Sequence, residues 1–158
     1  MIPVHIHSLG LDETNDQPVL MLREDSGRRV VPIWIGHPEA MAIMLASQGI
    51  EPPRPLTHDL LMEVISAAGL TVERVEITRV EEGTFFASLI LAGEDRTITV
   101  DARPSDSLAL AVRAGCPVFV HESVMISSGV IPEDEAEEEV AAFRDFLDHV
   151  EPEDFGSS

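Results

Sequence analysis

The stretch Glu51-Pro-Pro-Arg-Pro-Leu-Thr-His-Asp-Leu-Leu61 separates the first part of the chain from the rest and opens one of its helices. Its three prolines in four positions exclude a helix and a central strand there, because proline lacks an amide hydrogen and restricts the residue before it. A stiff, extended connector therefore precedes Leu56. From about His58 to Ala68 the apolar spacing is that of a helix, which Gly69 ends.

A second stretch, Asp101-Ala-Arg-Pro-Ser-Asp-Ser-Leu108, repeats the order of the first. Both consist of Arg-Pro, a hydroxyl residue, an aspartate and an apolar helical run. The hydroxyl of Thr57 or Ser105 can cap its helix, and the aspartate lies in the first turn, where the helix dipole favours negative charge. Capping leaves the repeated arginine unexplained. We therefore predict that the two helix starts form one polar site.

Length and composition predict one globular domain. The chain has 158 residues, of which 44% are hydrophobic and 25% charged, which is enough apolar material for one core. No apolar run reaches the roughly 18–20 residues of a membrane span, and the N-terminus lacks the pattern of a signal peptide. We expect a cytoplasmic protein that does not contact a membrane. The single cysteine, Cys116, excludes an internal disulfide and a thiolate metal cluster.

The charge of the chain is strongly acidic. The formal net charge is −19, from 29 acidic residues and ten basic ones, and every basic residue is arginine. The 26 residues after Pro132 hold 11 acids and one arginine, whereas the first 132 hold 18 acids and nine arginines. Proteins that neutralise many phosphates usually have a basic stripe, which this composition does not indicate. The nine arginines of the body can still gather locally and bind phosphate in bidentate fashion.

The hydrophobic patterns predict an α+β fold. We expect a single compact domain with a mixed, mostly antiparallel sheet, three packed helices and a C-terminal helix. The expected strands are residues 2–9, 19–23, 29–35, 71–80, 84–92, 96–102 and 117–121. The expected helices of the body are residues 38–48, 58–68 and 105–114. The first of these is apolar almost all round, which predicts burial on several sides.

The predicted domain covers residues 1–131, and residues 132–158 differ in character. They begin with a nearly continuous acidic run, which is typical of a solvated linker. The alternative function for this run is to mimic the charge of nucleic acid. Apolar residues then recur at helical spacing and predict an amphipathic helix that docks on the body or on a partner: Val140, Phe143, Phe146, Leu147 and Val150. A frayed end follows.

The two related stretches supply the candidate site residues. The candidates for catalysis are Arg54, His58, Asp59, Asp101, Arg103 and Asp106, and the candidate metal ligands are Glu39, Asp101 and Asp106. Carboxylates without thiolates suit Mg²⁺ or Mn²⁺, and such an ion can polarise a phosphodiester while arginines stabilise the developing charge. A histidine can act as general base or acid. No organic cofactor is expected, because the sequence lacks a glycine-rich phosphate loop.

Several motifs in series give the chain a resemblance to a known family. They are Gln17-Pro-Val-Leu-Met-Leu-Arg-Glu24, Val31-Pro-Ile-Trp-Ile-Gly36 with Glu39, Glu51 to Leu60, Glu82-Gly-Thr-Phe-Phe86 and Asp101 to Ser107. Over roughly residues 3–130 the chain resembles the bifunctional nuclease domain family. The acidic link and the Phe143-to-Phe155 tail resemble the ending of bacterial, actinobacterial-type members. The resemblance implies nuclease activity on RNA and DNA, nucleic acid as the partner, and an α+β domain that self-associates. It implies no catalytic mechanism.

Three functional hypotheses remain open from the sequence. The first is a nuclease assisted by a divalent metal ion and working through the candidate residues. The second is a non-enzymatic regulatory module in which the same residues bind a small anion or a partner peptide. The third is a structural oligomer held by arginine–aspartate pairs between subunits. For all three we predict a homo-oligomer, most simply a dimer, because the edges of a small sheet must be covered or paired.

Overall fold

Seven strands form one sheet in the order β3-β2-β1-β7-β4-β5-β6. This arrangement is that of a computed structural model, which describes residues 1–132; the predicted C-terminal helix lies outside the described residues. All neighbouring strands are antiparallel except β4 and β7, which are parallel, so the predicted mixed sheet is confirmed. The strands are β1 (Ile2–Asp12), β2 (Gln17–Glu24), β3 (Val30–Trp34), β4 (Thr71–Glu81), β5 (Thr84–Ala92), β6 (Thr97–Ala102) and β7 (Val118–Val120).

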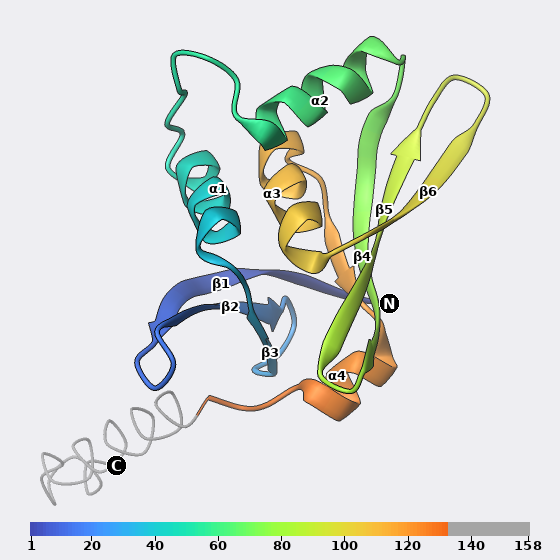
Figure 1. The fold of residues 1–158 in the computed structure, drawn as a ribbon. Helices are drawn as coiled ribbons and strands as arrows, with labels where there is room; N and C mark the ends of the chain where they lie inside the picture. The colour runs from blue at the N-terminus through green and yellow to red at the C-terminus, as the bar shows by residue number, and fades with distance from the viewer. Residues whose placement is uncertain (133–158) are drawn as a thin grey trace, which may run out of the picture.

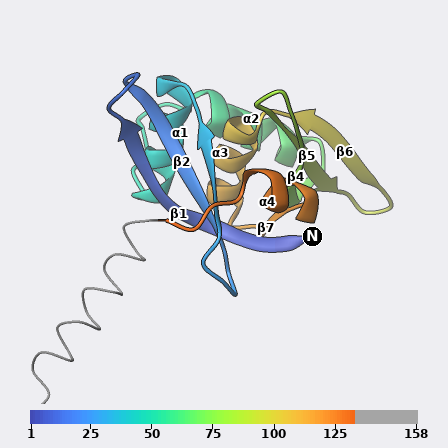
Figure 2. The same ribbon diagram turned by 90° about the horizontal axis from the view of Figure 1, so that it is seen from below.

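The helices lie on both faces of this sheet. Three of them, α1 (His37–Ser47), α2 (Thr57–Ala67) and α3 (Pro104–Ala114), lie on one face, as Figure 1 shows. The short α4 (Glu122–Ser128) packs on the other face against β3 and β4, and it lies in front of the sheet when the molecule is seen from below (Figure 2). The sequence patterns did not predict α4. Among these helices none is long and apolar enough to cross a membrane.

The shortest strand, β7, joins two antiparallel units. On one side Ile2–Val4 of β1 pair with Val118–Val120, and on the other side Val75–Ile77 of β4 pair with the same three residues. Their side chains alternate into the core, where Val75, Ile77 and Val120 are completely buried. The N-terminal hairpin strands and the β4–β6 meander thereby become one sheet with a continuous core.

Helix α3 lies at the centre of the helical layer. It contacts α1, α2 and the sheet, and seven of its 11 residues are buried. Alanines at positions 109 and 111 lie among leucines at 108 and 110, and the small side chains allow neighbouring elements to approach closely. Gly115 ends the helix with φ of 66°, a left-handed conformation that glycine adopts without strain. The start of α3 lies directly after the end of the edge strand β6, since β6 ends at Ala102 and α3 begins at Pro104.

Helix α1 is less covered than its composition predicts. Only Ala42 and Ile43 are buried, whereas Met41 is 50% exposed and Met44 38%. The expectation of burial on several sides is therefore wrong for the single chain. A helix that is apolar all round exposes apolar surface when only one of its sides is packed.

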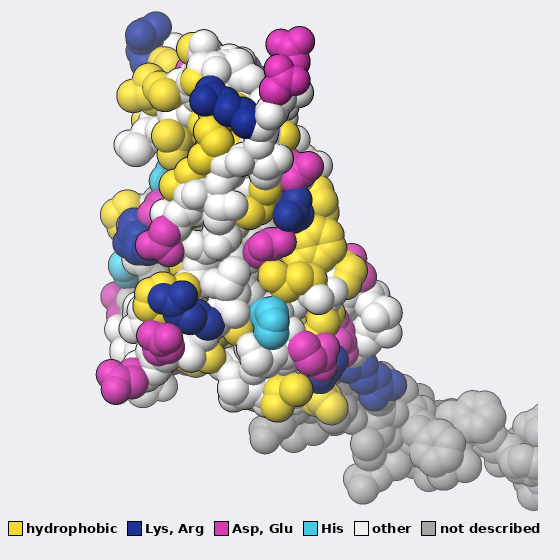
Figure 3. All heavy atoms as spheres, turned by 90° about the vertical axis from the view of Figure 1, so that its right-hand side faces the viewer, with side chains coloured by type: hydrophobic (Ala, Val, Ile, Leu, Met, Phe, Trp, Pro, Cys, Tyr) yellow, Lys and Arg dark blue, Asp and Glu magenta, His cyan; other side chains and the backbone are white. Residues whose placement is uncertain are grey.

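Arginine side chains are scattered over the face on the β6 side of the molecule. Figure 3 shows them singly among acidic, apolar and uncharged side chains, without an extended basic stripe among the described residues of this face. This distribution agrees with the acidic composition. Any binding of nucleic acid on this face therefore has few phosphate contacts available.

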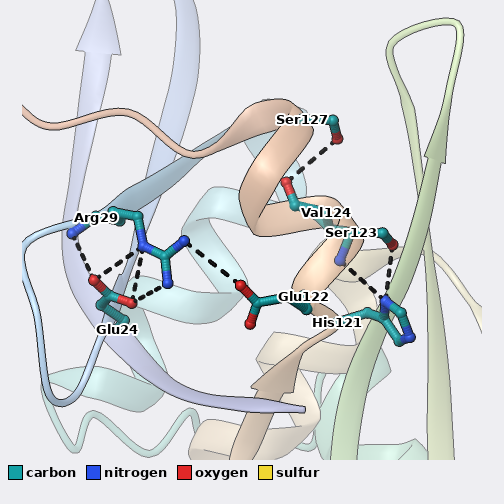
Figure 4. A network of polar contacts seen from close by, with 7 residues as sticks. All are labelled: Glu24, Arg29, His121, Glu122, Ser123, Val124 and Ser127. Carbon is teal, nitrogen blue, oxygen red and sulfur yellow. Dashed lines mark hydrogen bonds and ion pairs between the residues drawn. The ribbon is translucent and has the colours of Figure 1, made fainter.

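A buried carboxylate ties the β2–β3 hairpin to α4 (Figure 4). Glu24 is 8% exposed and accepts hydrogen bonds from the backbone and guanidinium of Arg29, at 2.9–3.2 Å. These bonds lower the pKa of Glu24. Arg29 also lies 3.8 Å from Glu122 of α4. A side chain at Gly27 would displace the Glu24 carboxylate from this position, because a Cβ there would lie 2.0 Å from Oε1.

Candidate functional site

The two related helix starts meet within one chain. Nε2 of His58, in the first turn of α2, lies 2.9 Å from Oδ1 of Asp106, in the first turn of α3. The prediction that residues 54–59 and 101–106 share one surface is confirmed by this contact. It arises because α2 packs against α3 on the same face of the sheet.

The helices start earlier than predicted, and their caps differ. Thr57 is the first residue of α2, and Pro104 is the first residue of α3, a position where proline's missing amide hydrogen is not needed. The N-cap residues are Leu56 and Arg103, and neither helix has a side-chain cap from its N-cap residue. The predicted caps by the hydroxyls of Thr57 and Ser105 are therefore wrong. In α2 the carboxylate of Asp59 instead accepts a hydrogen bond from the backbone amide of Leu56, at 3.0 Å.

The contact with Asp106 determines which nitrogen of His58 can act as a base. A carboxylate only accepts hydrogen bonds, so the neutral imidazole places its proton on Nε2, facing Asp106. Nδ1 then keeps its lone pair. The His58 side chain is 13% exposed and the Asp106 side chain 32%, so the pair sits at the edge of the solvent. Asp106 thus holds the ring in one tautomer and one orientation.

Arg103 joins two carboxylates beside this histidine. Its guanidinium lies 2.9 Å from Oδ2 of Asp106 and 3.0 Å from Oε1 of Glu39, the first acidic residue of α1. Asp106 above all, and then Glu39, raise the pKa of Arg103. Its side chain is nevertheless 66% exposed, so the cation remains open to a ligand. Three helix starts therefore contribute to one polar cluster of four residues: Glu39, His58, Arg103 and Asp106.

Asp59 points to a different arginine. Its Oδ1 lies 2.8 Å from Nε of Arg113, in the last turn of α3, which also donates to the carbonyl of Ala109 at 2.8 Å. Arg113 and then the Leu56 amide lower the pKa of Asp59. Oδ1 of Asp59 thus joins α2 to α3, while Oδ2 is used at the start of α2 itself. Its catalytic role stays a prediction, and its geometry is that of a structural tie.

Two predicted residues stand apart from the cluster. Arg54 is exposed in the connector and makes no ion pair with the described residues. Asp101 is exposed on the edge strand β6, where the strand pairs Val100 with Leu89 and Ala102 with Ala87 on the helix-covered face. Asp101 lies between these two residues and is exposed, and it is also one of the residues that line the cavity beside α2 and α3. Within the single chain Asp101 is not buried against an arginine, and its predicted role as a metal ligand or catalyst stays a prediction.

The polar cluster forms a shared wall between two cavities. One, of about 750 Å³, lies between α2, α3 and strands β5 and β6. The other, of about 740 Å³, lies between α1, the connector and α2. His58, Arg103, Asp106 and Thr57 line both cavities, while Glu39 lines the second and Asp101 the first. A ligand at the cluster can therefore extend to either side.

The donor set fits a divalent cation in chemistry but not in its present arrangement. Glu39 and Asp106 provide two carboxylates beside one arginine, so a phosphodiester brought here meets an excess of negative charge that a cation would offset. However, no group of three or more His, Cys, Asp or Glu side chains within residues 1–132 is placed to hold one metal ion. Arg103 lies between Glu39 and Asp106 and would have to leave before they could share an ion.

The sequence analysis did not identify two residues of this region. Arg113 lies seven positions after Asp106, two helical turns on, so the spacing alone puts both side chains on one face of α3. Ser107 is completely buried and lines the larger cavity, and its hydroxyl has no hydrogen-bond partner in the described part of the chain. The sequence contains no signal that the Ser107 hydroxyl lacks a hydrogen-bond partner, because this depends on which groups surround it in the fold.

Comparison with known proteins assigns this fold to a family. The family model of the bifunctional nuclease domain matches residues 20–133, which include every residue of the polar cluster. An uncharacterized protein of Mycobacterium tuberculosis is 47% identical over 161 residues, covering 96% of each chain.

Relatives in plants are more distant and much longer. A protein of Oryza sativa named bifunctional nuclease 2 is 31% identical over 145 residues, which cover 88% of this chain and 45% of the rice protein. A protein of Arabidopsis thaliana named bifunctional nuclease 1 is 26% identical over 117 residues, covering 72% of this chain and 36% of its own length. The chain thus spans less than half of each of these two plant proteins.

Proposed function

Because this chain belongs to the bifunctional nuclease domain family, we propose that it hydrolyses phosphodiester bonds of RNA or DNA at the cluster of Glu39, His58, Arg103 and Asp106. The observation that supports this most is the contact between His58 and Asp106 beside the open cation Arg103. The pair supplies a base, and the arginine supplies a charge for phosphate oxygens. Both lie at the wall of two cavities large enough for a substrate to pass.

In the proposed reaction His58 activates the nucleophile. Nδ1 takes a proton from a water molecule as the water oxygen attacks phosphorus, and the imidazolium that forms is stabilised by Asp106 through Nε2. The bond to the leaving oxygen breaks, and that oxygen takes up a proton from solvent. Asp106 is in this scheme a positioning residue, since it acts on the reaction through His58.

Arg103 and the start of α3 stabilise the charge of the transition state. The guanidinium can turn from the carboxylates toward the phosphoryl oxygens, because it is largely exposed. The first amides of α3 have no intrahelical partner, and no side chain of the N-cap residue covers them. Donors that are already in place when charge develops are worth several kcal/mol in an active site, roughly a hundredfold or more in rate.

Cleavage assays test the proposal directly. Purified protein should cut labelled RNA and DNA strands, and the cut should disappear with the Arg103→Ala variant. Arg74→Ala is a matched control, because Arg74 is also a partly exposed arginine paired with two carboxylates, Glu73 and Glu76 of β4, and it lines neither cavity. Binding of inorganic phosphate or an acidic peptide by a protein that cuts no nucleic acid would instead support the non-enzymatic module.

We also propose that Mg²⁺ or Mn²⁺ assists the reaction, with Glu39 and Asp106 as ligands once Arg103 has turned to the phosphate. Metal-stripped protein is then expected to lose cleavage and to regain it with either ion. Glu39→Gln should need at least about tenfold more Mn²⁺ for half-maximal activity, because a charged ligand is lost while the side-chain shape is kept. The thermal midpoint of wild type, but not of Glu39→Gln, should rise with Mn²⁺.

Asp101→Asn in the same experiment tests the third predicted ligand. It removes one charge from an exposed side chain, so folding should be unchanged. A loss of about a hundredfold in cleavage would place Asp101 in the site, whereas unchanged, metal-dependent cleavage would leave only Glu39 and Asp106 as ligands. Full activity of rigorously metal-free wild type would contradict the proposed metal assistance.

We propose that the chain self-associates, as predicted, through the outer sides of α1 and α2. Apolar side chains lie exposed there, with Leu60 56% and Val64 54% exposed, close to Met41. An acidic protein associates most readily through a face that carries few charges. Leu60→Asp is expected to turn a dimer into a monomer of about half the mass in sedimentation. Ile126→Asp, an equally apolar exposed position on α4, should leave the dimer intact; a monomeric wild type at micromolar concentration would contradict the proposal.

A further inference from the structure

The cavity between α2 and strands β5 and β6 has walls suited to a flat apolar group. Its volume of about 750 Å³ lies within the range of small-molecule sites, roughly 300–1,000 Å³. Leu61 of α2 and Val100 of β6 line it and are each 39% exposed, so apolar surface is open to the solvent at its mouth. Phe85 and Leu89 of β5 form part of the apolar lining. A ring that enters finds contacts on several sides.

The polar residues around this cavity include Thr57, Thr84 and Asp101 as well as the two groups that follow. At one end lie His58, Arg103 and Asp106, the reactive groups of the proposed nuclease site. Among the apolar residues lies Ser107, whose hydroxyl is buried without a hydrogen-bond partner in the described residues. Buried hydroxyls are usually hydrogen-bonded, so this one remains available to a polar group that reaches it when the side chains around it shift. The cavity therefore combines apolar walls, polar groups at its edges with an unpaired hydroxyl beneath its lining, and a cation at its end.

We propose that this cavity holds one unstacked nucleobase of a single-stranded RNA or DNA, with the adjoining phosphodiester at His58 and Arg103. This inference rests on the proposed nuclease function and names its substrate class. A base has apolar faces, polar edges and a phosphate at a fixed distance, which matches the three features of the cavity. Bases in a duplex are stacked and paired, so only a single strand, or a strand opened at some cost, can supply one.

The charge of the protein supports the same conclusion. The described residues hold 18 acids and nine arginines, and the arginines on the β6 side are scattered (Figure 3). Binding through many phosphate contacts is therefore excluded on this face, and base contacts must supply most of the affinity. The logarithm of the binding constant falls with the logarithm of the salt concentration, and each neutralised phosphate of a single strand adds about 0.7 to the magnitude of that slope. We therefore expect a slope of magnitude only about 1.

The test compares strands in binding and in cleavage. Fluorescence anisotropy would use 12-nucleotide RNA and DNA strands, their duplexes and an abasic strand, with His58→Gln protein so that cleavage is slow. We expect single strands to bind at least about tenfold more tightly than duplexes or the abasic strand. Wild type should cleave single strands correspondingly faster. RNA and DNA strands measured side by side show whether the 2′-hydroxyl contributes.

Two neighbouring residues of β6 provide a matched pair of variants. Val100→Asp places a charge at the mouth of the cavity and should weaken single-strand binding at least about tenfold. Thr99→Asp adds the same charge on the opposite face of the strand, where it pairs with Ile90, and should change binding less than about twofold. Ser107→Ala removes only the unpaired hydroxyl; binding should weaken about threefold while the thermal midpoint does not fall.

Each outcome decides between the two proposals. If wild type cleaves single strands and duplexes equally, or the abasic strand binds as tightly as the normal one, the nucleobase cavity is wrong while the nuclease function stands. Equal effects of Val100→Asp and Thr99→Asp lead to the same conclusion. If wild type neither binds nor cleaves any of the strands, both proposals are overturned.

Discussion

Replacement of His58 by glutamine is expected to lower the kcat for phosphodiester cleavage by about 10²–10⁴-fold, the usual contribution of a general acid or base. Glutamine can still donate a hydrogen bond to Asp106, as Nε2 of the histidine does at 2.9 Å. It has no nitrogen that can accept a proton from water, however. The variant therefore removes the proposed base while keeping the contact between α2 and α3, so its thermal midpoint should stay close to that of wild type.

A variant of a second histidine, His7, is the control for the loss of an imidazole ring outside the site. His7 is exposed on β1, and His7→Gln should keep full activity. Cleavage rates and thermal midpoints would be measured on the same samples of both variants. A folded His58→Gln protein with undiminished kcat would remove His58 from the mechanism, and the nuclease proposal would then need another base.

Replacement of Asp59 by alanine is expected to lower the free energy of unfolding by about 3 kcal/mol. The change removes the hydrogen bond to the Leu56 amide, worth about 1 kcal/mol at a helix start, and leaves Arg113 without its carboxylate. Arg113 is only 11% exposed, so its charge is poorly hydrated once the partner is lost. For a chain of this size the thermal midpoint should fall by about 6–12 °C.

The effect of Asp59→Ala should depend on pH in a defined direction. The pKa of Asp59 is lowered from the usual 3.8, chiefly by Arg113, so its contribution to stability is complete above that value. It is lost as pH falls from about 3.8 through the lowered pKa of the folded state. Urea unfolding at pH 7 and at pH 3 would show the difference between wild type and variant shrinking in acid.

Glu63→Ala is the matched control for this prediction. Glu63 lies on the same helix, α2, but is exposed, and its loss should change stability by less than about 0.5 kcal/mol. A difference between Asp59→Ala and Glu63→Ala that stays constant from pH 7 to pH 3 would contradict the ion pair as its source. Loss of activity with full stability in Asp59→Ala would instead support the predicted catalytic role.

Local patterns in the sequence were sufficient for most of the fold. The alternation of apolar and polar residues predicted the strands of the meander. The positions of prolines and glycines predicted the limits of α1 and α2 to within a few residues. The repeated Arg-Pro order also indicated correctly that two helix starts meet. These features depend on residues close together in the chain, whose conformational preferences and periodicity act before any long-range contact forms.

The partners within the site could not be predicted in the same way. Asp59 and Asp106 occupy equivalent places in the two stretches, yet one pairs with Arg113 and the other with His58 and Arg103. The crossing of α2 over α3 decides this, and no local pattern encodes it. The short α4 was also missed, because its seven residues include valine and isoleucine and are held by packing on the sheet rather than by helix propensity.

By itself the sequence determined the class of fold, the acidic charge and the residues from which a site could be built. Tertiary structure alone decided that the three residues of β7 join two sheets into one, that Asp101 stays exposed on the edge strand β6, and that Arg103 rather than Arg54 lies beside His58. The physical reason is that periodicity fixes on which face of an element a side chain lies. Which element covers that face depends on how the whole chain packs around its core.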